Sequence, residues 1–196
     1  MPDEVAYVAR AVESRRREFT TGRHCARVAL GQLGFASVPI TRGERGEPRW
    51  PDGVVGSITH CAGYRAAAVA RAADVVTIGI DAEPNAPLPE GVLGLISLPS
   101  ERAELAELAR VAPGVAWDRL LFCAKESVYK AWAPLTQTFL GFPEAEVAFD
   151  PSSATFLTRL RRPGAEAVGG PRRELAGRFA VSDGLAVTAT VRLAGA

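Results

Sequence analysis

The fold of this chain centres on residues 117–132, which read WDRLLFCAKESVYKAW. A helix is expected here, ended by Pro134. The chain holds 23 lysines and arginines, and only two of them are lysines. Both, Lys125 and Lys130, lie in this stretch. Lysine is a compact point charge suited to a phosphate oxygen, whereas arginine suits bidentate contacts. The stretch therefore predicts anion binding, or else Glu126 and Lys130 form an ordinary surface pair worth about 0.2–0.5 kcal/mol.

A second signal lies upstream in residues 78–83, which read IGIDAE. Alternation along a strand places Asp81 and Glu83 on one face. Neighbouring carboxylates repel each other, which is best tolerated when a cation lies between them. Oxygen ligands without a nearby histidine or cysteine favour Mg²⁺, and Gly79 would let a ligand approach the backbone. The alternative is a half-buried strand with a solvated acidic face.

Arginines gather in the N-terminal third of the chain. Arg23 and Arg27 share one face of an expected helix, with Arg23 at its N-terminal end, where phosphate is readily bound. Residues 42–51 follow as a Gly- and Pro-rich loop with three arginines and a tryptophan. His60 ends the next expected strand and precedes the candidate metal strand. Each feature also has a structural interpretation: a solvated basic face, a connecting loop and a structural histidine.

The remaining patterns predict an α+β fold of helices and hairpin-linked strands. Residues 20–22 should separate the first two helices, and the second and third strands should pair across a turn at 72–74. Asp183-Gly184 should close the last hairpin. Helices are expected at 3–18, 23–33, 100–110 and 117–132. Strands are expected at 54–59, 65–71, 75–80, 146–149, 154–160, 178–181 and 185–193.

Length and composition exclude several classes of protein. The 196 residues, 47% of them hydrophobic, are enough for one compact unit or two joined halves. The net charge of +1 gives no global field toward nucleic acid or an anionic membrane. Three cysteines without a C-x-x-C pair predict reduced thiols rather than disulfides or zinc. No signal peptide or membrane span is visible, so we expect a soluble cytoplasmic protein.

Together these segments resemble the 4′-phosphopantetheinyl transferase superfamily, specifically its longer, single-chain Sfp-type members of the enterobactin and actinobacterial kind. Three motifs carry the resemblance in the family's order and separation: 50–61 (WPDGVVGSITHC), 78–83 (IGIDAE) and 122–132 (FCAKESVYKAW). The resemblance runs from about Arg15 to the C-terminus. Members usually have more residues before the first arginine-rich helix, so we expect a short or trimmed N-terminal arm.

The resemblance implies a particular architecture and reaction. Two pseudo-symmetric halves, 1–84 and 85–196, would each pack a long helix on a small, mostly antiparallel sheet, with the active site between them in a monomer. Coenzyme A would bind there in the presence of Mg²⁺. Its phosphopantetheine arm would move to a serine of an apo acyl, peptidyl or aryl carrier protein, and adenosine 3′,5′-bisphosphate would be released.

The resemblance also assigns roles to residues. Glu126 would take the serine proton, directly or through a metal-bound water. Mg²⁺ would be held by Asp81, Glu83 and Glu126. The 3′-phosphate and adenine end would be clamped by Arg15, Arg23 and Arg42, with residues 43–45 as the nucleotide loop. The catalytic set would be Glu126, Lys130, His60 and Lys125. The coenzyme-binding set would be Arg15, Arg23, Arg42, Gly43, Glu44, Arg45, Thr59, His60, Asp81, Lys125, Glu126 and Lys130.

Two other classes of protein use similar residues. A metal-dependent nuclease or phosphatase would need the same carboxylates, but the common nuclease pattern has a lysine two residues after the second acid. Here Glu83 is followed by Pro84-Asn85. A non-catalytic carrier-protein or nucleotide-binding module would be expected to have lost an acid or a motif lysine, and none is missing. The transferase is therefore the predicted function.

Overall fold

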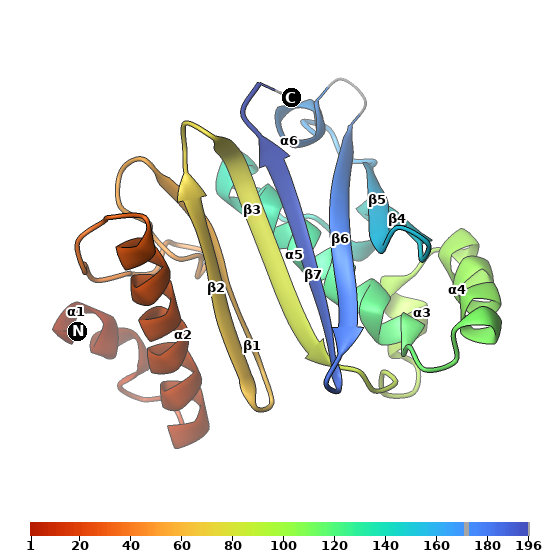
Figure 1. Ribbon diagram of the computed structural model, residues 1–196, viewed down its shortest axis with the longest axis horizontal. Coiled ribbons are helices and arrows are strands. Elements are labelled where there is room, and N and C mark those ends of the chain that lie inside the picture. Colours follow the sequence, from red (N-terminus) through yellow and green to blue (C-terminus); the bar gives the residue numbers. More distant parts are fainter. Residues whose placement is uncertain (171–172, 196) are drawn as a thin grey trace.

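The computed structural model describes residues 1–170 and 173–195, and it contains two antiparallel sheets, each accompanied by a long helix (Figure 1). The larger sheet has the strand order β3-β7-β6-β5-β4. Its strands are β3 (Val75–Pro84), β4 (Ala145–Asp150), β5 (Thr155–Leu160), β6 (Glu174–Ser182) and β7 (Leu185–Leu193). The smaller sheet is a hairpin of β1 (Val54–Cys61) and β2 (Tyr64–Arg71). The predicted α+β class is confirmed.

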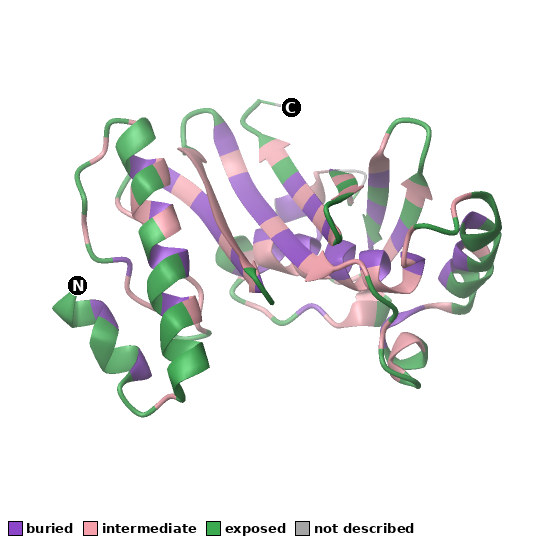
Figure 2. Cartoon of the chain, turned by 60° about the horizontal axis from the view of Figure 1, so that its bottom comes forward, coloured by how far each residue is buried: buried purple, intermediate pink, exposed green. Residues whose placement is uncertain are grey.

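The main core lies between the larger sheet and helix α5 (Trp117–Thr136). The apolar residues of α5 recur at helical spacing and so form one buried face. That face includes Leu120, Leu121, Ala124, Val128 and Trp132, all with no exposed surface. Shorter elements surround this core: α3 (Val92–Ile96), α4 (Pro99–Val111), η2 (Phe142–Glu144) and α6 (Glu166–Gly169). Figure 2 shows the buried positions concentrated where helices and strands meet.

Helix α5 and strand β3 approach each other closely at Gly79. A Cβ atom at this position would lie 1.8 Å from the carbonyl oxygen of Ser127 and 2.7 Å from the amide nitrogen of Ala131. Both are backbone atoms, which cannot move aside as a side chain can. The glycine therefore serves contact between helix and strand, and the expectation that Gly79 admits a ligand to the backbone is wrong.

The N-terminal part of the chain packs helix α2 (Glu13–Gln32) on the β1–β2 hairpin. Its small core is formed by Ala26, Leu30, Ile40 and Val54. The short elements α1 (Pro2–Val5) and η1 (Ala6–Val8) precede it. Buried Glu4 fastens this end, because its carboxylate accepts hydrogen bonds from the Ile40 amide at 2.8 Å and from Arg27.

Strands β1 and β3 lie side by side and run in the same direction, but in different sheets. Side-chain hydroxyls join them in place of a backbone ladder. The Ser57 hydroxyl accepts a hydrogen bond from the Ile80 amide, and the Thr59 hydroxyl accepts one from the Ala82 amide, both at 3.1 Å. We call this contact the seam, and it connects the two sheets beside the third motif's helix.

Two predictions about helix boundaries are wrong. Helix α2 continues through residues 20–22, where a break was expected, because Gly22 allows close contact with Ile58: a Cβ there would lie 3.0 Å from its methyl carbon. The break comes earlier, at Val12, whose backbone is extended. Helix α5 also continues past Pro134 to Thr136. A proline in the last turn removes only one intrahelical hydrogen bond, so the helix need not end there.

Strand pairing also differs from expectation. Strand β2 pairs with β1 through a tight turn at Gly63, whose φ is 77°, while β3 pairs with β7. The expected hairpin across 72–74 is therefore wrong. The expected hairpin at Asp183-Gly184 is confirmed, with φ of 52° and 75° joining β6 to β7. Both left-handed positions are those a type I′ turn requires.

The division of the chain into residues 1–84 and 85–196 stays a prediction. Strand β3, which that division assigns to the N-terminal half, lies in the sheet formed by the C-terminal strands. Within residues 1–170 and 173–195, no helix is long and apolar enough to cross a membrane.

Candidate active site

Asp81 on strand β3 is the most enclosed of the candidate carboxylates. Its Oδ1 atom accepts a hydrogen bond from the Thr59 hydroxyl at 3.0 Å and an ion pair from Lys130 Nζ at 2.6 Å. Lys130 also donates to the carbonyl of Ile80 at 3.2 Å. The other oxygen, Oδ2, is buried and has no hydrogen-bond partner. Because an unpaired buried carboxylate oxygen is costly, this atom indicates a site for a cation or donor.

Glu83 lies two residues farther along the same strand and is paired with Arg119. Arg119 Nη1 donates to Glu83 Oε2 at 3.1 Å, and the same guanidinium donates to the carbonyls of Ala86 and Pro87. Burial and the neighbouring Asp81 charge raise the pKa of Glu83, and Arg119 opposes them. Arg119 thus fixes Glu83 to the segment that follows β3.

Glu126 projects from helix α5 on the same face as Arg119 and Lys130. Burial raises the pKa of Glu126; the Lys130 charge lowers it, and the charges of Asp81 and Glu83 raise it further. The three predicted metal ligands therefore influence one another electrostatically. Among the described residues, however, no three His, Cys, Asp or Glu side chains are already grouped closely enough to hold a metal ion.

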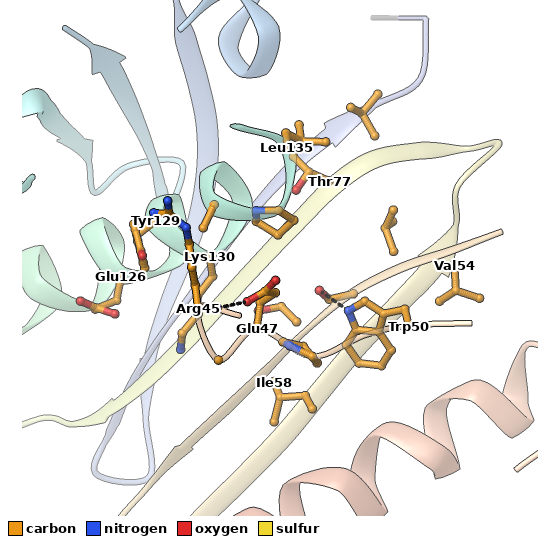
Figure 3. Close-up of a pocket in the computed structure, with 18 residues that line it drawn as sticks. Arg45, Glu47, Trp50, Val54, Ile58, Thr77, Glu126, Tyr129, Lys130 and Leu135 are labelled. Carbon is orange, nitrogen blue, oxygen red and sulfur yellow. Dashed lines mark hydrogen bonds between the residues drawn. The ribbon is translucent and has the colours of Figure 1, made fainter. Parts of the chain in front are cut away.

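A cavity of about 470 Å³ opens between helix α5 and the loop before β1 (Figure 3). Glu126, Tyr129 and Lys130 lie on its helix side, and Trp50 forms part of the apolar wall on its hairpin side. Arg45 reaches from the loop toward Lys130. Glu47 and Glu126 line the same cavity, so its wall carries both cationic and anionic groups.

A second, smaller cavity of about 120 Å³ is basic. Arg15, Arg23 and His60 line it, so three predicted ligands meet there. Arg15 Nη1 lies 2.8 Å from His60 Nε2, and Glu18 lies 3.7 Å from His60 Nδ1. Burial lowers the pKa of His60, the Glu18 charge opposes this, and Arg15 adds to it. A neutral imidazole, which can accept from Arg15, is therefore favoured.

Arg23 is the buried member of this basic group. Its Nε donates to the Ile40 carbonyl at 2.8 Å, and its guanidinium carbon lies 3.4 Å from the centre of the Phe19 ring. Burial lowers its pKa to about 10, so it remains a cation at neutral pH. Arg27, four residues on, instead pairs with Glu4 away from the cavity.

The predicted nucleotide loop folds back on itself. The amide of Gly43 donates to the carbonyl of Glu47 at 2.8 Å, and the amide of Arg45 donates to Glu47 Oε2 at 3.0 Å. Arg42 bridges to Pro48 through its backbone, while Glu44 is exposed. The loop thus closes a short turn that brings Arg45 to the larger cavity.

Two predicted ligands are already engaged elsewhere. The Thr59 hydroxyl is buried and is used in the seam, where it donates to Asp81 and accepts from Ala82. Lys125 donates to Glu101 at 2.8 Å within the protein interior. Burial lowers its pKa and Glu101 opposes this shift. The structure therefore does not bring Lys125 to the cluster of Asp81, Glu126 and Lys130.

Comparison with known proteins identifies the family to which this site belongs. Residues 3–70 match the 4′-phosphopantetheinyl transferase N-terminal domain, and residues 77–177 match the 4′-phosphopantetheinyl transferase superfamily. The chain belongs to the 4′-phosphopantetheinyl transferase superfamily. The predicted family and the predicted enzyme class, a 4′-phosphopantetheinyl transferase, are both confirmed.

Several known proteins are similar in sequence to most of this transferase chain. It is 61% identical to 4′-phosphopantetheinyl transferase Svp of Streptomyces mobaraensis, covering 96% of this chain and 76% of the relative. It is 51% identical to 4′-phosphopantetheinyl transferase PptT of Mycobacterium tuberculosis, covering 97% and 85%. Enterobactin synthase component D of Salmonella typhimurium is 36% identical over 70% of this chain and 56% of its own length.

Sequence reasoning missed Arg119 and Tyr129 of the transferase site. Arg119 stands seven residues before Glu126, and two helical turns bring such residues to one face. That spacing could have identified Arg119. Tyr129 adjoins Lys130 in the third motif and lines the larger cavity. Its aromatic contact with Phe139, 5.7 Å between ring centres, depends on tertiary structure and leaves no sequence signal.

Proposed function

We propose that this transferase moves the 4′-phosphopantetheine arm of coenzyme A to a serine of an apo carrier protein domain and releases adenosine 3′,5′-bisphosphate. The family and the names of its relatives support the transfer. One structural observation carries the rest: Glu126 and Lys130 line one cavity with Arg45, and Lys130 joins that cavity to the half-satisfied Asp81. In this proposal the active site lies between residues 1–84 and 85–196.

The two cavities suit a long ligand with both anionic and apolar parts. Gly46, Pro48 and Ile58 line both of them, so the cavities adjoin. We place the 3′-phosphate and adenine end of coenzyme A at Arg15 and Arg23, which line the basic cavity, and at Arg42, whose guanidinium lies against Gly46 of that cavity. The pyrophosphate would then lie toward His60 and Lys130, and the apolar wall beyond would accommodate the rest of the ligand.

The donor set fits Mg²⁺. Asp81 Oδ2 is a buried oxygen without a partner, and the raised pKa values of Glu83 and Glu126 each include repulsion from Asp81. These three oxygen donors would hold the ion, as hard cations prefer. When bound, Mg²⁺ would neutralise charge on the pyrophosphate. Arg119 and Lys130 already offset part of the carboxylate charge, since they pair with Glu83 and Asp81.

The chain's own residues account for proton transfer and charge. The serine oxygen attacks the phosphorus next to pantetheine, and the bond from that phosphorus to the oxygen on the adenosine side breaks. Glu126 accepts the serine proton, since it is a carboxylate on the wall of the larger cavity and burial raises its pKa above the ordinary glutamate value, which makes it a stronger base. Lys130 and Arg45 would offset the charge on the transferred group. Arg15, Arg23 and Arg42 would retain the leaving nucleotide.

The direct test is transfer itself. Purified enzyme, coenzyme A and Mg²⁺ incubated with a panel of apo acyl, peptidyl and aryl carrier domains should add the mass of one phosphopantetheinyl group to a serine, as seen by intact-protein mass spectrometry. Carrier domains with that serine changed to alanine are the control. No gain with any carrier, together with metal-dependent cleavage of DNA or a phosphomonoester, would contradict the proposal.

A further inference from the structure

Lys125 differs from Lys130 in having no donor left for a ligand. Its Nζ atom donates to the carbonyl of Ile96 at 2.8 Å, to Glu101 Oε2 at 2.8 Å and to the carbonyl of Phe142 at 2.9 Å. An ammonium group has three N–H donors, and all three are used. Only 1% of the side chain is exposed, whereas 28% of Lys130 is exposed.

Glu101 is engaged through both of its carboxylate oxygens. Besides Lys125, it accepts hydrogen bonds from the amide of Leu98 at 2.7 Å and from the amide of Val147 at 2.8 Å. Its side chain is 1% exposed. Lys125 and Glu101 together therefore form a closed charge pair, which we call the buried node. Removing one member would leave the other charged and without its partner inside the protein.

The buried node ties four elements to helix α5. It reaches the last residue of α3, the first turn of α4, the start of η2 and strand β4. The tie through Phe142 matters for the site, because the segment 139–142 lines the same cavity of about 80 Å³ as Lys125 and Glu126. The segment that borders Glu126 is thus held by the residue directly before Glu126.

The geometry points to Lys125 as a positioning residue rather than a phosphate ligand: through the buried node it sets helix α5 and the segment 139–142 so that Glu126 faces the larger cavity. This inference rests on the proposed function, in which Glu126 accepts the serine proton. It predicts that replacing Lys125 lowers turnover and leaves the affinity for coenzyme A unchanged. It also predicts that a second substitution, at Glu101, recovers part of the lost turnover.

Coenzyme A binding separates a ligand from a positioning residue. Isothermal titration calorimetry would compare Lys125→Met/Glu101→Gln with Lys130→Met. Loss of one charged contact in Lys130→Met should weaken binding about 10–100-fold. The double variant removes both charges of the node and touches no ligand, so its dissociation constant should stay within about twofold of the original. A double variant that binds as weakly as Lys130→Met overturns the inference.

Turnover tests the coupling to Glu126. Lys125→Met alone should lower kcat about 10²-fold, the loss expected when a reacting group is displaced by about 1 Å. Glu101→Gln added to Lys125→Met should recover part of this loss, because it removes the uncompensated buried charge although the hydrogen bonds to Ile96 and Phe142 stay lost. A direct phosphate contact cannot be restored by a change at Glu101. A kcat that the second substitution leaves uncorrected therefore contradicts the inference.

Hydrogen exchange keeps this result distinct from failure of the proposed function. If the original enzyme modifies no carrier, the proposed function fails, yet the node can still be measured. Amides of residues 140–147 should exchange faster in Lys125→Met and return toward the original rates in Lys125→Met/Glu101→Gln. Unchanged exchange in Lys125→Met would show that Lys125 does not hold this segment, and the inference would then be wrong.

Discussion

Opposing influences act on the Glu126 side chain. Burial disfavours its charged form, and the carboxylates of Asp81 and Glu83 act in the same direction, while Lys130 favours the charge. The net result is a raised pKa. A base is most useful when its pKa approaches the working pH, so the environment that makes Glu126 costly to ionise also suits it to accept a proton.

The first prediction concerns base catalysis by Glu126. The group must be deprotonated to act, and its folded pKa lies above the ordinary glutamate value. Activity should therefore fall as the pH drops through the pKa of Glu126, which burial raises and bound Mg²⁺ would lower. Glu126→Gln should lower kcat about 10²–10⁴-fold and flatten this acidic limb. The measurement is kcat/KM for the carrier against pH.

Metal binding and base catalysis can be told apart by the response to Mg²⁺. In Asp81→Ala a proposed metal ligand is lost, so raising Mg²⁺ should recover part of the activity. In Glu126→Gln the proton acceptor is lost, so saturating Mg²⁺ should not help. Equal recovery of both variants would mean that Glu126 is only a ligand and that the proton leaves through water.

The second prediction concerns the arginine clamp. Arg23→Ala and Arg42→Ala should each raise the KM for coenzyme A by about tenfold or more, the value of one charge-assisted contact. The effect should be much smaller with 3′-dephospho-coenzyme A, which has no 3′-phosphate for them to bind. Arg49→Ala is the matched control, because Arg49 is exposed on the same loop. Equal losses with both donors would assign these arginines another role.

At the scale of elements, the register between helix α5 and strand β3 decides which side chains meet. Ser127 and Ala131 of the helix contact the strand at Gly79, and the Thr77 hydroxyl donates to the Ala131 carbonyl at 2.8 Å. This contact places Lys130 against Asp81. The motifs at 78–83 and 122–132 therefore form one site, because the close approach of β3 and α5 at Gly79 brings Asp81 and Lys130 together.

The third prediction tests that register. Gly79→Ala would force a methyl group against the backbone of α5, so the free energy of unfolding should fall by about 1–3 kcal/mol, and activity should fall with it. Gly31→Ala is the control, since a Cβ there meets nothing within 4 Å. Gly31 lies in the last turn of α2, so that change should be neutral or stabilise by at most about 1 kcal/mol. Urea unfolding measures both. If Gly79→Ala left the free energy of unfolding unchanged, the close contact between β3 and α5 would not be required.

Local patterns identified the elements better than their partners. Helix α5 and the last hairpin follow from apolar periodicity and turn residues, which act over a few positions. Strand β3 pairs with β7, which lies more than a hundred residues away in the sequence. Nothing in the local sequence encodes that pairing. The continuity of α2 through Gly22 likewise depends on Ile58, a residue on another element. Tertiary packing decided each of these points.

At the scale of the whole molecule, the candidate site depends on how the two sheets meet. The family resemblance grouped Asp81, Glu126 and Lys130 in the prediction. In the structure Lys130 pairs with Asp81, and the charges of both residues act on the pKa of Glu126. The sequence could not show that Lys125 and Thr59 are engaged inside the protein. A lysine or a threonine looks the same in sequence whether its side chain faces a ligand or the protein interior. Burial and hydrogen-bond partners distinguish them.

The last prediction concerns the seam that joins the sheets. Thr59 is its centre, since the hydroxyl both accepts from the Ala82 amide and donates to Asp81 Oδ1. Thr59→Val keeps the shape and removes the hydroxyl, which leaves a buried amide unpaired and should cost about 1–3 kcal/mol of unfolding free energy. It should also lower activity, because Asp81 loses a partner that orients it.

Thr59→Ser is the matched control for that change. It keeps the hydroxyl, so both hydrogen bonds can form and activity should stay near that of the original enzyme. Urea unfolding, carrier modification and hydrogen exchange of the Ile80 and Ala82 amides would be measured on both variants. If Thr59→Ser loses as much stability and activity as Thr59→Val, the methyl group rather than the hydroxyl matters. The two sheets would then be held by packing, and Asp81 would be oriented by Lys130 without help from the seam.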